Sequence, residues 1–183
     1  MQTNLTKDFL TVLKNQEVVN ASMLVNFLGK YGEYLTQLPN KRLTMECLSA
    51  LNRIEKETTN NCVISQTQLK VGDVCFIDFG HAYMYEAGYQ HFGIIIKISH
   101  YKIFVVPMTS NQQTQRQLKE GHDKEQSHVF DLGWIAGLTK QSVCFLNDAK
   151  FINAARVIDV KGFLPPESYI FRKLKKRLFE TIF

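Results

Sequence analysis

The chain has 183 residues, 45% of them hydrophobic and 11% aromatic, with few Gly and Pro, which predicts a globular protein. No apolar run approaches the roughly 20 residues that cross a bilayer, and the opening segment MQTNLTKDFL lacks the basic and apolar regions of a signal peptide. The net charge of +5 favours a polyanionic partner such as a nucleic acid.

The cysteines indicate a reducing compartment. Cys47, Cys62, Cys75 and Cys144 are widely spaced and form no CxxC pair, and three of them lie in apolar runs. Small, reduced residues of a core are the ordinary interpretation of this pattern. We therefore expect a cytoplasmic location.

Residues 1–58 show helical periodicity. Asn20 is placed to cap a second helical segment, and Pro39 opens a third. The third segment carries an apolar stripe made of Leu43, Cys47, Leu48, Leu51 and Ile54. The polar run ETTNN at 57–61 is the clearest break in the chain. It predicts a helical N-terminal extension over 1–58 and a second domain over 62–183.

The second domain begins with short apolar runs rich in β-branched and aromatic residues. These runs, separated by polar turns, are 71–80, 92–99, 101–110 and 142–147. They predict a small, mostly antiparallel β-barrel, with a tight hairpin between the second and third runs. The polar segment 111–126 predicts a solvated loop or a short exposed helix. A stripe of Phe171, Leu174, Leu178 and Ile182 predicts a C-terminal helix over 167–181, and hence an α+β fold.

One turn of the barrel is rich in groups that can carry protons. In YEAGYQHFG, Glu86 and His91 stand just ahead of an apolar strand, and the strand after it ends at Thr109 and Ser110. A hairpin brings these strand ends together, so His91 and Thr109 are expected to be neighbours. A carboxylate, an imidazole and a hydroxyl there would suit proton transfer at a phosphodiester. The alternative stays open, because Ser and Thr often end strands as turn formers.

Several segments resemble, in order, the MazF/PemK/Kid toxins of bacterial toxin–antitoxin pairs. From about Lys70 onward, KVGDVCFIDFG is similar to the Arg-Gly-Asp-aromatic strand of this family, and YEAGYQHFGIIIK to its Ser-Glu-Gln-Gly-Gly-x-Arg-Pro turn and strand. FVVPMTSN resembles the strand that ends in the catalytic Thr-Ser region, and SHVFDL the Thr-His-Val strand. GLTKQSVCFLNDAKFINAARV runs alongside the last conserved block of the family without a gap.

The resemblance implies an SH3-like barrel, a homodimer and a metal-independent endoribonuclease that needs no cofactor. Its substrate would be single-stranded RNA, cut by attack of the ribose 2′-hydroxyl, and its partner a cognate antitoxin. Carried over by position, Glu86 and Thr109 are catalytic, and His91 stands at the position of the catalytic arginine. The resemblance places Ser110, His128, Lys150 and Arg156 among the residues that contact RNA. Trp134 is expected either to stack on an RNA base or to plug the core.

His91 is the main departure from the family pattern. Arginine keeps its charge and grips a phosphate with two parallel hydrogen bonds, whereas imidazole offers one and can lose its proton. Two accounts fit: His91 is a working acid or base, or the site is impaired and the barrel binds RNA or a protein without cutting. Inhibition of DNA gyrase, found in a related toxin family of this fold, is a third hypothesis. His81, His91, His100, His122 and His128 show no metal-ligand spacing, so we expect no metal.

Overall fold

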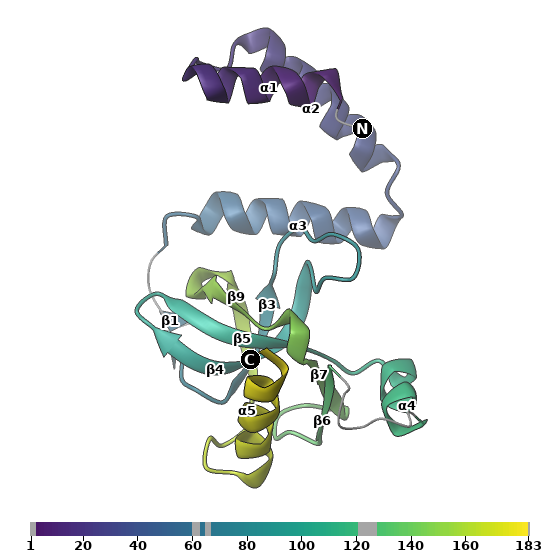
Figure 1. Ribbon diagram of the computed structural model, residues 1–183, viewed down its shortest axis with the longest axis vertical. Helices are drawn as coiled ribbons and strands as arrows, with labels where there is room; N and C mark the ends of the chain where they lie inside the picture. Colours follow the sequence, from purple (N-terminus) through teal and green to yellow (C-terminus); the bar gives the residue numbers. More distant parts are fainter. Residues whose placement is uncertain (1–2, 60–62, 65–66, 121–127, 183) are drawn as a thin grey trace. The chain divides into compact units, whose positions relative to one another are not determined.

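The computed structural model describes residues 3–59, 63–64, 67–120 and 128–182 (Figure 1). The chain divides into two compact units, residues 1–45 and 46–183. The division falls inside the third helix. Cys62 and part of the expected boundary at 57–61 lie outside the described residues, so the predicted domain limits stay a prediction.

The first unit contains helices α1 (Asn4–Asn15) and α2 (Ala21–Thr36). The predicted cap of the second helix is confirmed, because the side chain of Asn20 accepts a hydrogen bond from the amide of Met23 at 2.9 Å. This bond satisfies one of the amides that a helix N-terminus leaves without a partner in the helix.

The contact between α1 and α2 is aromatic and only partly covered. The rings of Phe9 and Phe27 meet edge to face with 6.2 Å between their centroids, and Phe27 stacks on Tyr31. An apolar groove lies along this contact. Both helices are described from end to end, and neither contains a fully buried side chain. The helix pair therefore gains little from burial by itself.

Helix α3 (Asn40–Lys56) buries polar residues rather than its apolar stripe. Glu46 and Ser49 are 2% and 4% exposed, whereas Leu51 and Ile54 are 55% and 72% exposed. The predicted helix is present, and its buried side is the one that carries hydrogen-bonding groups. The periodicity of apolar residues alone therefore gives the wrong inner face for this helix.

The second unit is built on antiparallel strands. In chain order these are β1 (Val63–Ile64), β2 (Thr67–Gln68), β3 (Asp73–Asp78), β4 (Gln90–Ser99), β5 (Lys102–Thr109), β6 (Val129–Gly133), β7 (Ser142–Phe145), β8 (Lys150–Asn153) and β9 (Val157–Phe163). β1 and β2 form a small hairpin. The other seven form one sheet in the order β6-β7-β5-β4-β3-β9, with β8 paired to the first half of β5.

The two ends of this sheet meet. Phe163 at the end of β9 bridges to Ala136, which follows β6, and donates its amide hydrogen to the Ala136 carbonyl at 3.2 Å. The sheet is thus nearly closed on itself, and the predicted α+β fold with a small SH3-like antiparallel barrel is confirmed. Between β5 and β6, α4 (Gln112–Glu120) forms the short helix that was one of the two expectations for this segment, while residues 121–127 are not described.

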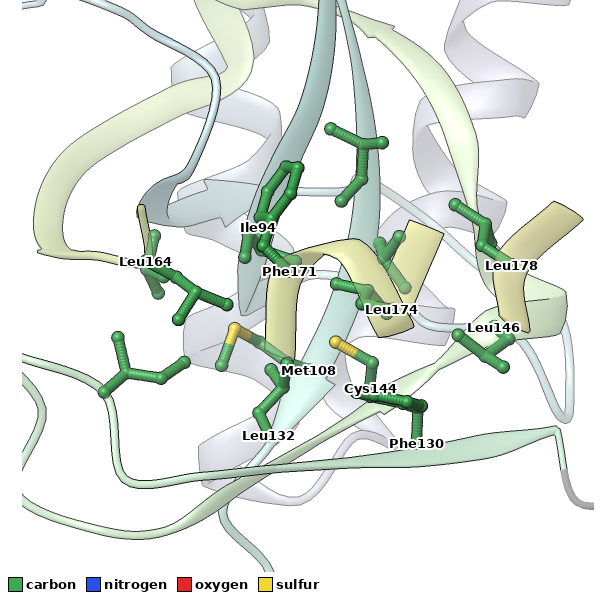
Figure 2. Packing of buried hydrophobic residues seen from close by; sticks show 14 residues of the cluster. Ile94, Met108, Phe130, Leu132, Cys144, Leu146, Leu164, Phe171, Leu174 and Leu178 are labelled. Carbon is green, nitrogen blue, oxygen red and sulfur yellow. The ribbon is translucent and has the colours of Figure 1, made fainter. Parts of the chain in front are cut away.

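The predicted C-terminal helix, α5 (Tyr169–Ile182), packs on one face of the sheet. Figure 2 shows Phe171, Leu174 and Leu178 of this helix among buried side chains from β4, β5, β6 and β7. A second apolar cluster lies on the opposite face and includes Ile77 and Ile95. The two clusters fix the sheet on both sides, so the polar residues at its edges have well-defined positions.

Candidate active site

The strand register places His91 and Thr109 opposite each other. Phe92 pairs with Met108 and Gly93 with Pro107, and the same register one residue further sets His91 against Thr109. Residues directly opposite in an antiparallel pair point to the same face with closely spaced Cβ atoms. The β4–β5 register therefore makes His91 and Thr109 neighbours, as the hairpin predicts.

This pair lies at the border between the apolar core and the surface. His91 pairs with Ile77 of β3 on one side, and Thr109 pairs with Val143 of β7 on the other. Ile77 and Val143 are almost completely buried, whereas His91 and Thr109 are half-buried. The register thus sets an imidazole and a hydroxyl at facing, half-buried positions next to buried strand residues, and oriented polar groups act most strongly in such partly desolvated surroundings.

The end of β5 fixes the Thr109 hydroxyl in a tight turn. The amide of Asn111 donates a hydrogen bond to Thr109 Oγ1 at 3.2 Å. A hydroxyl that accepts one bond can still donate its own hydrogen, so Thr109 keeps its donor capacity. Ser110, half-buried, follows it directly.

Glu86 lies in the connection between β3 and β4, residues 79–89, called here the 79–89 loop. Its stem is closed by two short backbone bonds between Phe79 and Tyr89 and between Tyr89 and Gly80, of 2.7 and 2.6 Å. Glu86 is exposed and its Oε2 accepts a hydrogen bond from the amide of Tyr83 at 3.1 Å. The carboxylate predicted to be catalytic thus also shapes its own turn.

The loop is fastened at its far side and presents aromatic rings at its tip. The amide of Ala87 donates to Asp148 Oδ2 at 3.1 Å. Tyr83 and Tyr85 are 87% and 94% exposed. Tyr85 has a backbone φ of 71°, a left-handed conformation that is uncommon for a residue with a side chain. The loop therefore holds a defined shape while its two tip tyrosines face solvent.

The two predicted cations of the last block both approach the start of this loop. Arg156 donates from Nη1 to the carbonyl oxygen of Asp78 at 3.2 Å. Lys150 on β8 pairs with Val105 of β5, and its Nζ lies 5.9 Å from the centroid of the Phe79 ring. Two cationic side chains therefore lie at the loop stem, near the start of β4, and side chains of this kind contact phosphate backbones.

His128 and Trp134 belong to a different part of the sheet. They flank β6, which is separated from β4 by β7 and β5, about 14 Å along the sheet. Trp134 is 66% exposed, and its neighbour Ile135, at 3%, enters the core in its place. Of the two expectations for Trp134, the core plug is wrong, and an exposed ring is found. The structure thus does not bring these two residues to His91 and Thr109.

A buried polar cluster lies beside the site, and the sequence analysis did not predict it. Asp78, at the end of β3 and 2% exposed, accepts hydrogen bonds from Ser49 Oγ at 2.5 Å, Asn52 Nδ2 at 3.1 Å and Gln90 Nε2 at 3.3 Å. In the part of the chain that the structure describes, every buried side-chain nitrogen and oxygen has a partner. A polar i, i+3, i+6 series at Glu46, Ser49 and Asn52 was the signal available in the sequence.

The buried thiols of Cys75 and Cys144 are unreactive. Burial raises the pKa of the Cys75 thiol to about 12, and nearby Asp73 and Asp159 add to the effect. Burial also raises the pKa of the Cys144 thiol. Both thiols are therefore protonated and poor nucleophiles near neutral pH. Among the described residues, no three His, Cys, Asp or Glu side chains gather as a metal site.

The chain is similar to solved structures of MazF proteins. One is a MazF from Deinococcus radiodurans, with 13% sequence identity over 61% of this chain and 94% of that chain, and a TM-score of 0.44. Another is the toxin MazF-mt6 from Mycobacterium tuberculosis, with 12% identity over 60% of this chain and 91% of that chain, and a TM-score of 0.36. No protein-family model and no curated protein matches the chain. None of its described helices has the length and apolarity needed to span a bilayer.

Proposed function

We propose that this chain is the toxin of a toxin–antitoxin pair and a metal-independent endoribonuclease that cuts single-stranded RNA. The observation that carries the proposal is the β4–β5 register, which, continued one residue beyond Phe92 and Met108, sets His91 opposite Thr109. The ordered series of MazF-like segments supports it, since the segments that resemble the family fall on β3, β4, β5, β6, β7, β8 and the turns beside them. The cations at the loop stem fit an RNA backbone.

In the proposed reaction the RNA supplies its own nucleophile. His91 in its neutral form takes the proton of a ribose 2′-hydroxyl, whose oxygen bonds to the adjacent phosphorus. The bond from phosphorus to the 5′-oxygen breaks, and that oxygen takes a proton from a general acid. The products are a 2′,3′-cyclic phosphate and a 5′-hydroxyl, so no water or cofactor enters this step.

Thr109 and Glu86 take the two remaining roles. The Thr109 hydroxyl donates a hydrogen bond to a phosphoryl oxygen as negative charge builds on it, which lowers the barrier if the bond strengthens in the transition state. Glu86 in its protonated form is the general acid, which gives its proton to the leaving 5′-oxygen while His91 takes the proton of the 2′-hydroxyl. The exposed position of its carboxylate suits this role, because the hydrogen bond from Tyr83 engages only one of its oxygens.

For the RNA path we propose Ser110, Lys150 and Arg156 as contacts near the site. His128 and Trp134 would form a second contact area on β6, where the exposed indole can stack on a base. In this proposal RNA extends from β4 across β5 and β7. We also expect a cytoplasmic homodimer that binds a cognate antitoxin, as the resemblance implies. Light scattering that reports a monomer at micromolar concentrations would contradict the dimer.

A second candidate function is a module that binds RNA or protein without cutting. It is favoured by the imidazole at the arginine position and by the bond that ties Glu86 to its own loop. Purified chain incubated with a long mixed RNA, with and without EDTA, separates the candidates. Discrete cuts that persist in EDTA support the nuclease, whereas intact RNA that is retarded on a gel supports the module. Intact, unretarded RNA together with inhibited DNA gyrase would favour gyrase inhibition instead.

A further inference from the structure

Glu46 is a buried carboxylate that the proposed chemistry does not use. It lies on α3 and is 2% exposed. Its Oε2 accepts a hydrogen bond from the Tyr89 hydroxyl at 2.6 Å, and its Oε1 lies 3.0 Å from Nε2 of His81. His81 and Tyr89 stand near the two ends of the 79–89 loop. One carboxylate therefore joins both ends of the loop to α3.

The neighbours of Glu46 on the same helix face extend this attachment to the start of β4. Ser49 and Asn52 donate hydrogen bonds to Asp78, the last residue before the loop. Gln90, the first residue after the loop, donates from Nε2 to Ser49 Oγ at 3.1 Å. Helix α3 thus holds the residue on each side of the loop as well as two residues within it.

The hydrogen bonds to the buried carboxylates of Glu46 and Asp78 are of a strong type. A buried carboxylate is costly to desolvate unless donors surround it, and bonds to an ionised group are shorter and roughly twice as strong as neutral ones. The same low-dielectric surroundings make the loss of one partner expensive. The loop backbone includes left-handed conformations at Tyr85 and Tyr89, which persist only where the surroundings impose them.

We propose that Glu46 is a positioning residue, and that α3 acts as a clamp that holds the 79–89 loop in the shape the site requires. The loop carries Glu86, and Tyr89 and Gln90 directly precede His91, so the clamp sets the positions of both proposed acid–base groups. The role in cleavage rests on the proposed nuclease function. The holding of the loop does not, and it can be measured without RNA.

The test compares hydrogen exchange of loop amides in the full-length chain and its variants. The Tyr89 and Phe79 amides report on the stem, and the Ala87 amide on the far side, because each has a hydrogen-bond partner within the unit. The variants are Glu46→Gln and Tyr89→Phe, which keep side-chain size. Glu57→Gln is the matched control, an exposed carboxylate at the end of α3 that pairs with Arg53.

We expect the loop amides to exchange roughly tenfold to a hundredfold faster in Glu46→Gln and Tyr89→Phe, as follows from losing a charged hydrogen bond. Exchange in the central strands and in Glu57→Gln should not change. His81→Ala should also loosen the loop, whereas His81→Gln, which keeps a donor, should restore most of the protection. Unchanged loop exchange in both Glu46→Gln and Tyr89→Phe would overturn the proposal.

Cleavage kinetics then test whether the held loop positions the proposed acid–base groups. A clamp predicts that Glu46→Gln lowers kcat by roughly tenfold or more with little change in KM. The control Glu57→Gln, whose exposed carboxylate pairs with Arg53 and lies outside the clamp, should leave kcat near the wild-type value. Equal losses of kcat in the two variants would contradict positioning. If the wild-type chain leaves RNA intact, the nuclease proposal fails while the exchange comparison still decides whether Glu46 holds the loop.

Discussion

His91 and Thr109 occupy opposite positions on β4 and β5, one residue beyond the paired Phe92 and Met108. The pair is flanked by Ile77 and Val143, which are buried and hold the two strands rigidly. An imidazole beside a hydroxyl on such a platform can transfer a proton and bind an oxyanion in the same event. The first two predictions separate these two tasks.

His91→Ala should reduce RNA cleavage by about two to four orders of magnitude, because a positioned general acid or base contributes on that scale. If His91 transfers a proton, the wild-type rate should change with pH, whereas a permanently charged phosphate clamp would leave it nearly constant. His91→Arg restores the side chain usual in the family and should keep activity only if the position clamps phosphate. Cleavage rates across pH 5–8 provide the measurement. Wild-type activity in His91→Ala would show that the turn is structural.

Thr109→Ala should lose rate, whereas Thr109→Ser should retain most of it, because serine keeps the hydroxyl donor. The loss should appear in kcat more than in KM if the hydrogen bond to the phosphoryl oxygen forms mainly in the transition state. Single-turnover kinetics on a short RNA give both parameters. Equal rates for the alanine and serine variants would remove Thr109 from the mechanism.

Asp78→Ala should destabilise the second unit by about 3 kcal/mol, because it leaves several buried donors without an acceptor. The donors are the side chains of Ser49, Asn52 and Gln90 and the amide of Gly80. The free energy of unfolding in urea gives the value. The exposed Glu167→Ala is the control and should change stability by less than about 0.5 kcal/mol. A similarly small effect of Asp78→Ala would mean that the polar cluster does not stabilise the fold.

The stability of the fold should fall in alkaline solution, partly through Cys75. Its thiol pKa is raised to about 12 in the folded state by burial, while an unfolded cysteine titrates near 8.5. The unfolded state therefore loses its proton first. The contribution is complete below about pH 8.5 and disappears as the pH rises toward 12.

Urea unfolding at pH 8 and at pH 10.5, on wild type and on Cys75→Ala, checks this expectation. The alanine variant should show a smaller loss of stability between the two pH values, although it is less stable at both. An equal loss in the two proteins would show that the Cys75 thiol does not contribute. Rapid modification of Cys75 and Cys144 in the folded protein at pH 8 would contradict their burial.

The hairpin and the C-terminal helix could be predicted because their signals are local. The apolar runs of β4 and β5 are separated only by a short turn. The stripe residues Phe171, Leu174 and Leu178 are likewise only three or four positions apart. The hairpin brings the start of β4 to the end of β5, but a bulge between Ile95 and Lys97 shifts the register by one residue, and this bulge sets His91 opposite Thr109 rather than Ser110. This part of the site depends on no long-range information.

The clamp could not be predicted in the same way, because its partners are far apart in the chain. Glu46 and Tyr89 are 43 positions apart, and Ser49 and Asp78 are 29 apart. The apolar stripe of α3 predicts that one face of the helix is buried. The buried carboxylate of Asp78 on β3 instead binds the face that carries Ser49 and Asn52. Periodicity measures the cost of exposing apolar groups and contains no information about a distant carboxylate that needs donors.

Analysis of the product ends on a defined RNA tests the central claim most directly. We predict that wild-type protein in EDTA leaves a 2′,3′-cyclic phosphate and a 5′-hydroxyl, seen by mass spectrometry, and that His91→Ala leaves neither above background. An oligonucleotide with a single 2′-deoxy sugar at the cleaved position should remain intact, because the nucleophile is missing. Cleavage of that deoxy substrate, products with a 5′-phosphate, or RNA that the wild-type protein binds but never cuts would contradict the account.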